Sequence, residues 1–376
     1  VRRARLLAVR LPDVIRQRSG RGWEPVHDYW ASAERITSRL PNRGRDRTVA
    51  EYLAANPRMP RRDRELLLSL VEGYDAAPAD RVGVHSISTK GAEPQCHDQL
   101  RLLSGYDSVA ARLASEWKVG NVSVRLGAAA REVRWRRGSV EVEASGVNGT
   151  ERCSGRAVLF TLPIGVWKAA PGTDGAIRLA PEIRSKRDAL AKMEMGAVVK
   201  VVLRFREPFW RDARNAPRGG APRGETPRFG FLQARGADFP TWWSAEPVDA
   251  PVLTAWAGGP AAEALAGLSE AEVAGRAVAT IAGLLGESRR RVSGLLEAWR
   301  MHDWQQDPFA RGAYAYLAPG GVEARAAFAR PVAGTLFFAG EATDAEEPGT
   351  VAGAIASGRR AARELLRARG TKRHSS

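Results

Sequence analysis

The chain has 376 residues, enough for two domains, and its 44% hydrophobic and 27% charged residues exclude a disordered protein. The net charge of +16 comes mostly from arginines that are spread along the whole sequence without a nucleic-acid-binding motif. A solvated basic surface is therefore favoured over a specific nucleic-acid site. The longest apolar stretch, residues 157–167, is too short to cross a membrane.

The N-terminal part combines a weakly periodic segment with two clearer helices. Residues 1–45 are rich in arginine and are expected to be helical in part. Thr48 and Glu51 have the spacing of a capping box, which predicts that a helix begins there. A second helix is expected from about residue 62 to residue 74, because leucines and a valine recur on one side of it.

Alternating strands are expected in the middle of the chain. A short helix at 107–117 precedes three predicted strands, at 122–126, 132–135 and 140–143. Asn148-Gly149 is a turn signal, and the apolar run at 157–161 predicts a buried strand after it.

Helices and strands continue to alternate toward the C-terminus. We expect a polar helix at 181–192, a long strand at 197–205 and a surface loop rich in Pro, Gly and Arg at 212–229. Ser269 and Glu272 form a second capping box, so a helix is expected to run from there to about residue 285. A buried strand at 335–340 and a helix at 350–369 complete the pattern, which is typical of an α/β or α+β fold with intertwined domains.

The cysteines and histidines suggest neither metal binding nor disulfide bonds. Cys96 and Cys153 have no metal-ligand spacing, and the five histidines are scattered, so no metal site is expected. Because no secretory signal is evident and disulfides are not expected, we predict a cytoplasmic protein.

The segment around Gly340 has the properties of a ligand site. A buried strand ends at Gly340, where the backbone can approach a ligand, and Glu341 follows at the ligand side of the sheet. The next helix opens near Thr350, so its free amides and dipole face the same crevice. Its small residues, including Ala354, leave room for a large ligand, although tight strand–helix packing explains them equally well.

Two further segments carry candidate site residues. The strand at 197–205 alternates, with Val199, Val201, Leu203 and Phe205 on one face and Lys200 on the other; by itself this pattern favours a half-buried strand with a solvated lysine. The segment from Trp304 to Tyr316 is rich in aromatic residues, which suit a cationic substrate, although Tyr314 taken alone is more simply an ordinary strand aromatic.

These motifs together resemble the flavin-containing amine oxidases, the family that holds monoamine oxidases, polyamine oxidases and lysine-specific histone demethylases. The resemblance covers nearly the whole chain from about residue 46 and implies FAD as the cofactor. Gly340 and Glu341 would contact its ribityl–phosphate part, and Thr350 and Val351 would lie beside the isoalloxazine, with Ala354 on the same helix. The reduced flavin carries negative charge at this edge, which a helix N-terminus stabilises.

The resemblance also implies roles for residues outside that helix. Lys200 would hold a water at flavin N5 and assist reoxidation by O2. Trp304 would flank the flavin, Tyr314 would line the substrate cavity at the flavin face, and the backbone of Val133 would contact adenine. Thr350 occupies the place where the monoamine branch has a second tyrosine.

The fold implied is α/β, in which an incomplete Rossmann-like FAD-binding domain is interwoven with a substrate domain made of a mixed sheet and helices. We expect four segments: residues 1–97 as the helical part of the substrate domain, 98–170 as the middle FAD segment, 171–298 as the sheet-and-helix part of the substrate domain, and 299–376 as the C-terminal FAD segment.

The family's N-terminal strand, G-x-G-x-x-G loop and helix are not matched. Gly20-Arg21-Gly22 is expected to have no strand before it. We therefore expect that a missing segment, or a partner subunit in trans, supplies the pyrophosphate site, and that the chain is inactive alone.

Three functions remain open from the sequence. The first is FAD-dependent oxidation of an amine, with O2 as acceptor and with peroxide and an imine as products. The second is an L-amino-acid oxidase of the same architecture, which requires an arginine in the cavity to clamp a carboxylate. The third is a catalytically inert fragment or subunit without its own FAD.

Overall fold

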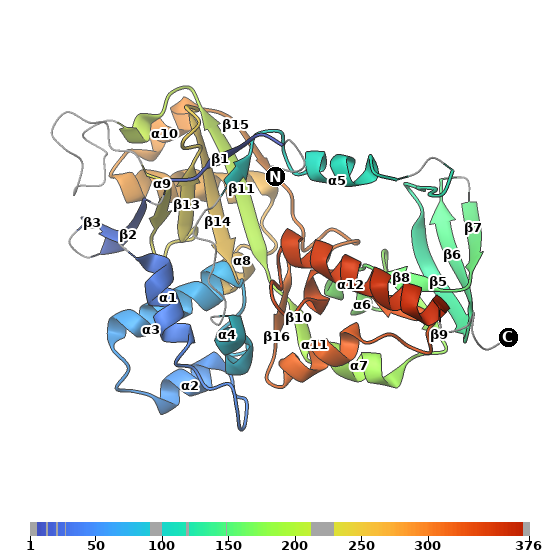
Figure 1. Ribbon diagram of the computed structural model, residues 1–376. Helices are drawn as coiled ribbons and strands as arrows, with labels where there is room; N and C mark the ends of the chain where they lie inside the picture. The colour runs from blue at the N-terminus through green and yellow to red at the C-terminus, as the bar shows by residue number, and fades with distance from the viewer. Residues whose placement is uncertain are drawn as a thin grey trace.

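A computed structural model describes residues 6–370, except for 13, 20–21, 27, 91–99, 118–119, 148 and 212–228. The fold is mixed α/β, as predicted. In Figure 1 a large sheet with helices against it lies above a group of short helices, and a second sheet lies at the opposite side of the molecule. The long C-terminal helix lies between these two regions.

The large sheet has seven strands, which are antiparallel to their neighbours except that β12 and β2 run parallel. In spatial order they are β15 (Leu296–Met301), β11 (Val198–Phe205), β14 (Val252–Gly258), β13 (Thr241–Ser244), β12 (Phe231–Gln233), β2 (Ile15–Ser19) and β3 (Gly22–Val26).

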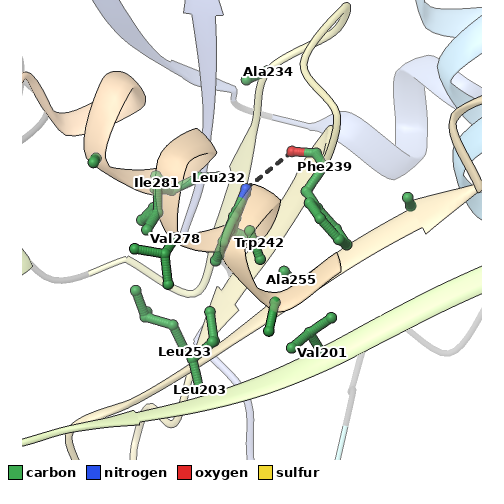
Figure 2. Close-up of a cluster of buried hydrophobic side chains, with 14 of the residues drawn as sticks. Val201, Leu203, Leu232, Ala234, Phe239, Trp242, Leu253, Ala255, Val278 and Ile281 are labelled. Carbon is green, nitrogen blue, oxygen red and sulfur yellow. Dashed lines mark hydrogen bonds between the residues drawn. The ribbon is translucent and has the colours of Figure 1, made fainter. Parts of the chain in front are cut away.

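One face of this sheet forms the largest core. Val201 and Leu203 of β11 are completely buried and lie beside Ile281 of helix α9 (Glu270–Leu285), as Figure 2 shows. Trp242 is also buried, and its Nε1 donates to the carbonyl of Phe239 at 3.0 Å. The alternation predicted for β11 is confirmed, because Lys200 is exposed on the opposite face. That second face is therefore available to form a site.

Four short helices and a π-helix pack below the sheet. They are α1 (Tyr29–Thr37), α2 (Val49–Ala55), α3 (Arg61–Leu68), the π-helix η1 (Ser69–Tyr74) and α4 (Val84–Lys90). Both predicted capping boxes are confirmed: Thr48 with Glu51 begins α2, and Ser269 with Glu272 begins α9. The helix predicted at 62–74 is present, but its last six residues widen into the π-helix, a feature that often marks functional sites.

Smaller sheets and helices form the other region. One sheet has the strands β7 (Gly149–Gly155), β6 (Ser139–Gly146), β5 (Ala129–Arg136) and β9 (Arg178–Ala180), in this spatial order. Three pairs of strands form separate small sheets: β17 (Leu336–Phe338) with β8 (Val158–Phe160), which run parallel, β10 (Met193–Met195) with β16 (Ala315–Leu317), and β1 (Ala8–Arg10) with β4 (Leu100–Leu102). The remaining helices are α5 (Asp107–Ala114), α6 (Ile164–Trp167), α7 (Arg184–Leu190), η2 (Phe209–Arg211), α8 (Pro260–Glu263), α10 (Arg289–Leu295), α11 (Gly321–Ala329), η3 (Glu341–Thr343) and α12 (Val351–Gly370).

Two expectations about strands were wrong. Residues 8–26 contain β1, β2 and β3, and α1 begins only at Tyr29, so a strand does end just before Gly20. It leads into the antiparallel strand β3 as a hairpin, however, and not into a helix. Residues 122–126 form no strand: Val122 and Val124 are exposed, and a strand forms only where a neighbour can pair with it.

Several features lie partly or wholly outside the described residues. These are most of the loop predicted at 212–229, Asn148 of the predicted turn, and Cys96. Cys153 is a free, exposed thiol. None of the described helices combines the length and apolar character that a membrane crossing requires. In the same part of the chain, no three His, Cys, Asp or Glu side chains come together as metal ligands would.

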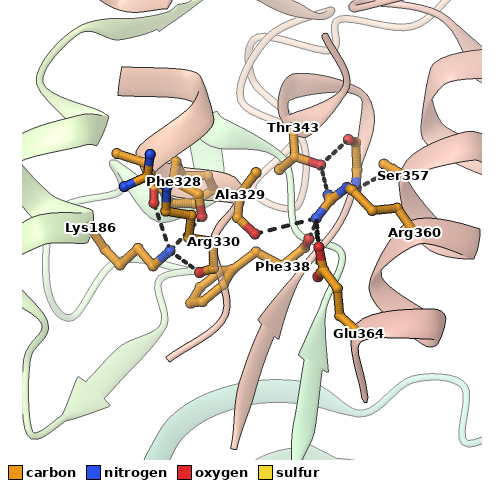
Figure 3. Close-up of polar contacts among 11 residues, drawn as sticks. Lys186, Phe328, Ala329, Arg330, Phe338, Thr343, Ser357, Arg360 and Glu364 are labelled. Carbon is orange, nitrogen blue, oxygen red and sulfur yellow. Dashed lines mark hydrogen bonds and ion pairs between the residues drawn. The ribbon is translucent and has the colours of Figure 1, made fainter. Parts of the chain in front are cut away.

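A buried lysine fastens α11 to its surroundings. The Lys186 ammonium donates to the carbonyl oxygens of Ala327 at 3.0 Å, Phe328 at 2.7 Å, and Arg330, and it lies 4.1 Å from the ring centre of Phe338 (Figure 3). Burial lowers the pKa of Lys186 to about 8, so the side chain is still mostly protonated at neutral pH. One cation thus satisfies the carbonyls that end this helix.

Replacing Lys186 by methionine is expected to lower the free energy of unfolding by about 3 kcal/mol at neutral pH, because three carbonyls lose their donor. Lys192→Met is the matched control: Lys192 is exposed, and its loss is expected to change stability by less than about 0.5 kcal/mol. Denaturant unfolding measures both variants. Equal stabilities would contradict the role assigned to Lys186.

Candidate active site

A cavity of about 350 Å³ lies between the second face of the large sheet, the short helices and the start of α12. Its floor is formed by side chains from four neighbouring strands: Trp256, Thr241, Trp243, Gln233, Phe231 and Ile15. The strand register places Trp256 opposite Thr241, and Thr241 opposite Gln233, so these residues form a row across the sheet. The floor of the cavity therefore crosses several strands.

Helix α1 and the π-helix supply the aromatic walls. Trp30 packs edge-on against Tyr74, with their ring centres 5.5 Å apart. The Trp256 Nε1 donates to the carbonyl of Gly73 at 3.0 Å, which fixes the end of the π-helix above strand β14. Aromatic rings therefore line the cavity from both the sheet and the helices.

Asp75 is the only residue with a formal charge among the described residues that line the cavity. It follows the π-helix directly and is 7% exposed. Burial raises the pKa of Tyr314, of Tyr74 and of Tyr29, and the negative charge of Asp75 adds to that shift in each case. The Asp75 carboxylate therefore raises the pKa of three tyrosines that line the cavity.

Tyr314 closes the cavity next to the start of α12. Its hydroxyl donates to the carbonyl of Tyr74 at 2.5 Å. Its ring lies against Gly349, where an added Cβ would meet the ring at 3.5 Å and where φ is +76°. A side chain at position 349 would have a strained backbone, so a glycine lies against the Tyr314 ring here.

Hydrogen bonds connect the residues that follow β17 to those at the start of α12. The Glu341 carboxylate accepts from the backbone amides of Ala315 at 3.2 Å and Gly349 at 3.0 Å. The Thr350 hydroxyl accepts from the amide of Gly353 at 2.9 Å and so caps the helix. The N-terminus of a 20-residue helix is thereby held at the cavity wall.

Arg360 fixes the same helix further along. Its guanidinium donates to the carbonyl of Phe338 and to the hydroxyl of Thr343, each at 3.0 Å (Figure 3). These bonds join α12 to the strand end at which Gly340 has a φ of +116°. A Cβ at Gly340 would be in ordinary van der Waals contact with the carbonyl oxygens of Thr161 at 3.9 Å and Leu162 at 4.0 Å, so it is the positive φ that favours glycine there.

Comparison with known proteins identifies this arrangement. The model of the flavin-containing amine oxidoreductase family matches residues 42–366. The chain belongs to this family. Membership assigns FAD as its cofactor, which confirms the resemblance seen in the sequence.

Several known proteins are similar to this chain over part or nearly all of its length. Lysine-specific histone demethylase 1 homolog 3 of Arabidopsis thaliana is 35% identical over 230 residues, which cover 60% of this chain and 13% of that protein. Among solved structures, putrescine oxidase bound to putrescine superposes with a TM-score of 0.76 at 17% identity, over 97% of this chain and 84% of that one. Cyclohexylamine oxidase from Brevibacterium oxydans gives 0.74 at 16% identity, over 99% and 84%. The chain thus spans only a small part of the first curated relative, and the structural likeness shows the fold.

The structure brings some of the predicted site residues together. Tyr314 and Thr350 line the cavity. Glu341 lies directly behind them through its bond to Gly349, and Gly340 precedes it. Lys200 pairs with Trp256 and points to the same face of the sheet, one strand beyond the cavity floor.

Other predicted residues of the family site lie apart from the cavity. Trp304 is 47% exposed and packs edge-on against His302. Val351 is 49% exposed at the start of α12, and Ala354 is half-buried on the same helix. Val133 lies in the four-stranded sheet, where its side chain is buried. These residues are not part of the cavity lining.

The sequence interpretation missed Asp75, Trp30 and Gln233. Gln233 lies on a strand that was not predicted, Trp30 lies in the segment that was expected only to be helical in part, and only the fold brings both beside Tyr314. Asp75 had only a weak local signal: it directly follows the Gly73-Tyr74 pair at the end of a leucine-containing helix. A charged residue at such a helix end is worth testing as a ligand group.

Proposed function

We propose that the chain forms the substrate-binding part of a flavin-dependent amine oxidase that oxidises the C–N bond of an amine, with O2 as acceptor. The observation behind the proposal is the aromatic cavity in which Asp75 is the one carboxylate among the described lining residues and which Tyr314 closes next to the start of α12. A protonated amine suits aromatic faces and a carboxylate, whereas a neutral or anionic substrate does not.

The residues present fit a flavin at the start of α12. The helix N-terminus offers its dipole there, and Gly340 ends the neighbouring strand without a side chain. Trp304 and Val351 present large apolar surfaces that a ring system can cover. When bound, FAD supplies the acceptor for a hydride from the carbon next to the amine nitrogen.

The chain's own residues position the reactants. We propose that Thr350 and Val351 lie beside the isoalloxazine, that Gly340, Glu341 and Ala354 support the cofactor, and that Val133 and Trp304 contact it further away. Tyr314 orients the amine, and its hydroxyl is already fixed on the carbonyl of Tyr74. Lys200 holds a water for the oxygen reaction, on the sheet face that also carries Trp256.

The cavity argues against an amino-acid oxidase. Recognition of an α-carboxylate calls for an arginine that binds it in a bidentate manner. The described residues that line the cavity include no arginine or lysine, and their one charged group, Asp75, would repel a carboxylate. An amine without an acid group is therefore the favoured substrate.

The proposal is tested by product balance. The FAD-loaded protein is incubated in air with a primary amine or with the corresponding L-amino acid, and hydrogen peroxide and carbonyl product are measured. We expect equal amounts of peroxide and aldehyde from the amine and none from the amino acid. Protein that holds FAD yet forms no peroxide with any amine of a broad panel would refute the proposal.

A further inference from the structure

The cavity has a polar end and an apolar end, and the order of the strands shows which is which. Trp256 lies on β14, next to the strand that carries Lys200, whereas Ile15 lies on β2, three strands further across the sheet. Adjacent strands are about 4.8 Å apart, so the floor from β14 to β2 extends over roughly 14 Å. The floor is therefore long enough for an ammonium group and an apolar group to lie over different strands.

The charge lies at the end nearer Lys200. The π-helix is fixed above β14 by the bond from Trp256 to Gly73, and Asp75 follows two residues later. Asp75 and Tyr314 both line the cavity, and the charge of Asp75 acts on the Tyr314 hydroxyl. The carboxylate thus lies beside the residue that closes the wall at the start of α12.

The far end is apolar and carries no charge among its described residues. Ile15 pairs with Phe231 across β2 and β12, and Leu11 and Pro12 close the cavity beyond them. Trp30 covers this end from α1 and packs edge-on against Tyr29. The polar group at this end, the Gln233 amide, is neutral and is hydrogen-bonded to the Tyr29 side chain.

We infer that Asp75 determines specificity by holding the ammonium group of a monoamine at the end of the cavity nearer Lys200, with the apolar body of the substrate over Phe231, Ile15 and Trp30. This inference takes from the proposed function only the position of the flavin near Lys200 and the start of α12. A diamine would place its second positive charge against the apolar end, where no described lining residue offers a carboxylate, and is disfavoured by that desolvation. The substrate class is thus an arylalkyl or cycloalkyl amine with one charge.

Binding measurements test the inference without turnover. Trp30, Trp243 and Trp256 line the cavity, so quenching of tryptophan fluorescence reports occupancy, with calorimetry as the second readout. The probes are 2-phenylethylamine, its neutral counterpart 2-phenylethanol, and butane-1,4-diamine. We expect the monoamine to bind at least about 10-fold more tightly than either of the others, because a charge-assisted bond is added without a second buried charge.

Three variants distinguish the contribution of the Asp75 carboxylate to binding from that of the rest of the cavity. Asp75→Asn is expected to weaken 2-phenylethylamine binding by about 10- to 100-fold and to leave 2-phenylethanol binding unchanged, which also shows that the cavity is intact. Glu72→Gln is the matched control, since Glu72 lies three residues earlier and does not line the cavity. Gln233→Glu places a carboxylate at the far end and is expected to raise the affinity for the diamine by about 10-fold or more.

Two results would overturn the inference. One is that Asp75→Asn keeps the preference for the monoamine over the alcohol. The other is that the unmodified protein binds butane-1,4-diamine more tightly than 2-phenylethylamine. These outcomes are independent of the proposed function: a protein that binds the monoamine through Asp75 but never transfers electrons from it would refute the oxidase and leave the binding assignment intact.

Discussion

Gly353→Ala is expected to destabilise the protein by about 3 kcal/mol and to abolish FAD retention, because the helix start must move. A Cβ at Gly353 would lie 2.1 Å from the carbonyl oxygen of Glu347 and 2.9 Å from its carbon, and both are backbone atoms that cannot rotate away. The Thr350 cap, which accepts from the Gly353 amide, would be lost with the shift. Denaturant unfolding and the visible absorption of bound flavin per protein measure the two effects.

The same helix contains a matched control. Gly358 lies five residues further along α12, and a Cβ there would meet no atom within 4 Å. Gly358→Ala is therefore expected to stabilise the helix by up to about 1 kcal/mol and to keep FAD. Equal stability and equal flavin content in the two variants would show that α12 does not begin against Glu347 as described.

Lys200→Met is expected to slow reoxidation of the reduced flavin by O2 roughly 100-fold while leaving its reduction by amine nearly unchanged. Lys200 is exposed on the sheet face that carries Trp256, one strand from the cavity floor, so its ammonium can hold a water without touching the substrate. Stopped-flow absorbance measures the two half-reactions separately.

A control on the same strand distinguishes this role of Lys200 from the effect of removing any positive charge from that face of the sheet. Arg204 is exposed on the same face of β11, four residues from Lys200, and pairs with Glu297. Arg204→Met is expected to leave both half-reactions unchanged. If Lys200→Met reoxidises as fast as the unmodified protein, the role proposed for this lysine is wrong.

Local patterns predicted those parts of the fold that local interactions determine. The alternation of β11 reflects one buried and one open face, and the Thr48 and Ser269 caps need only a partner three residues away. The strand–helix unit from Gly340 to Thr350 was recognised because its glycines and its acidic residue lie close together in sequence. The family match also covers this unit.

Non-local interactions determined what the sequence could not show. Strand β2 pairs in parallel with β12, so Ile15 meets Phe231 across more than two hundred residues, and arginines obscure its alternation. Residues 122–126 have the alternating pattern of a strand but form none, since an apolar pattern predicts a strand only where a partner lies beside it. The cavity itself is assembled from such distant segments, which is why Trp30 and Gln233 were missed.

The substrate is decided by the cavity and not by the fold. Putrescine oxidase and cyclohexylamine oxidase superpose on this chain almost equally well, although one name denotes a diamine and the other an apolar monoamine. In this chain the one charged group among the described lining residues, Asp75, lies at the end nearer Lys200, and the far end is apolar. That distribution of charge is the physical reason to favour the monoamine.

The proposed oxidase activity can be measured by anaerobic titration of the FAD-loaded protein with 2-phenylethylamine, followed by admission of oxygen. We expect that the visible flavin absorption is lost in proportion to the amine added and returns with O2 as peroxide forms. Flavin that stays oxidised with a saturating amine, while the tryptophan fluorescence shows that the amine is bound, would contradict it.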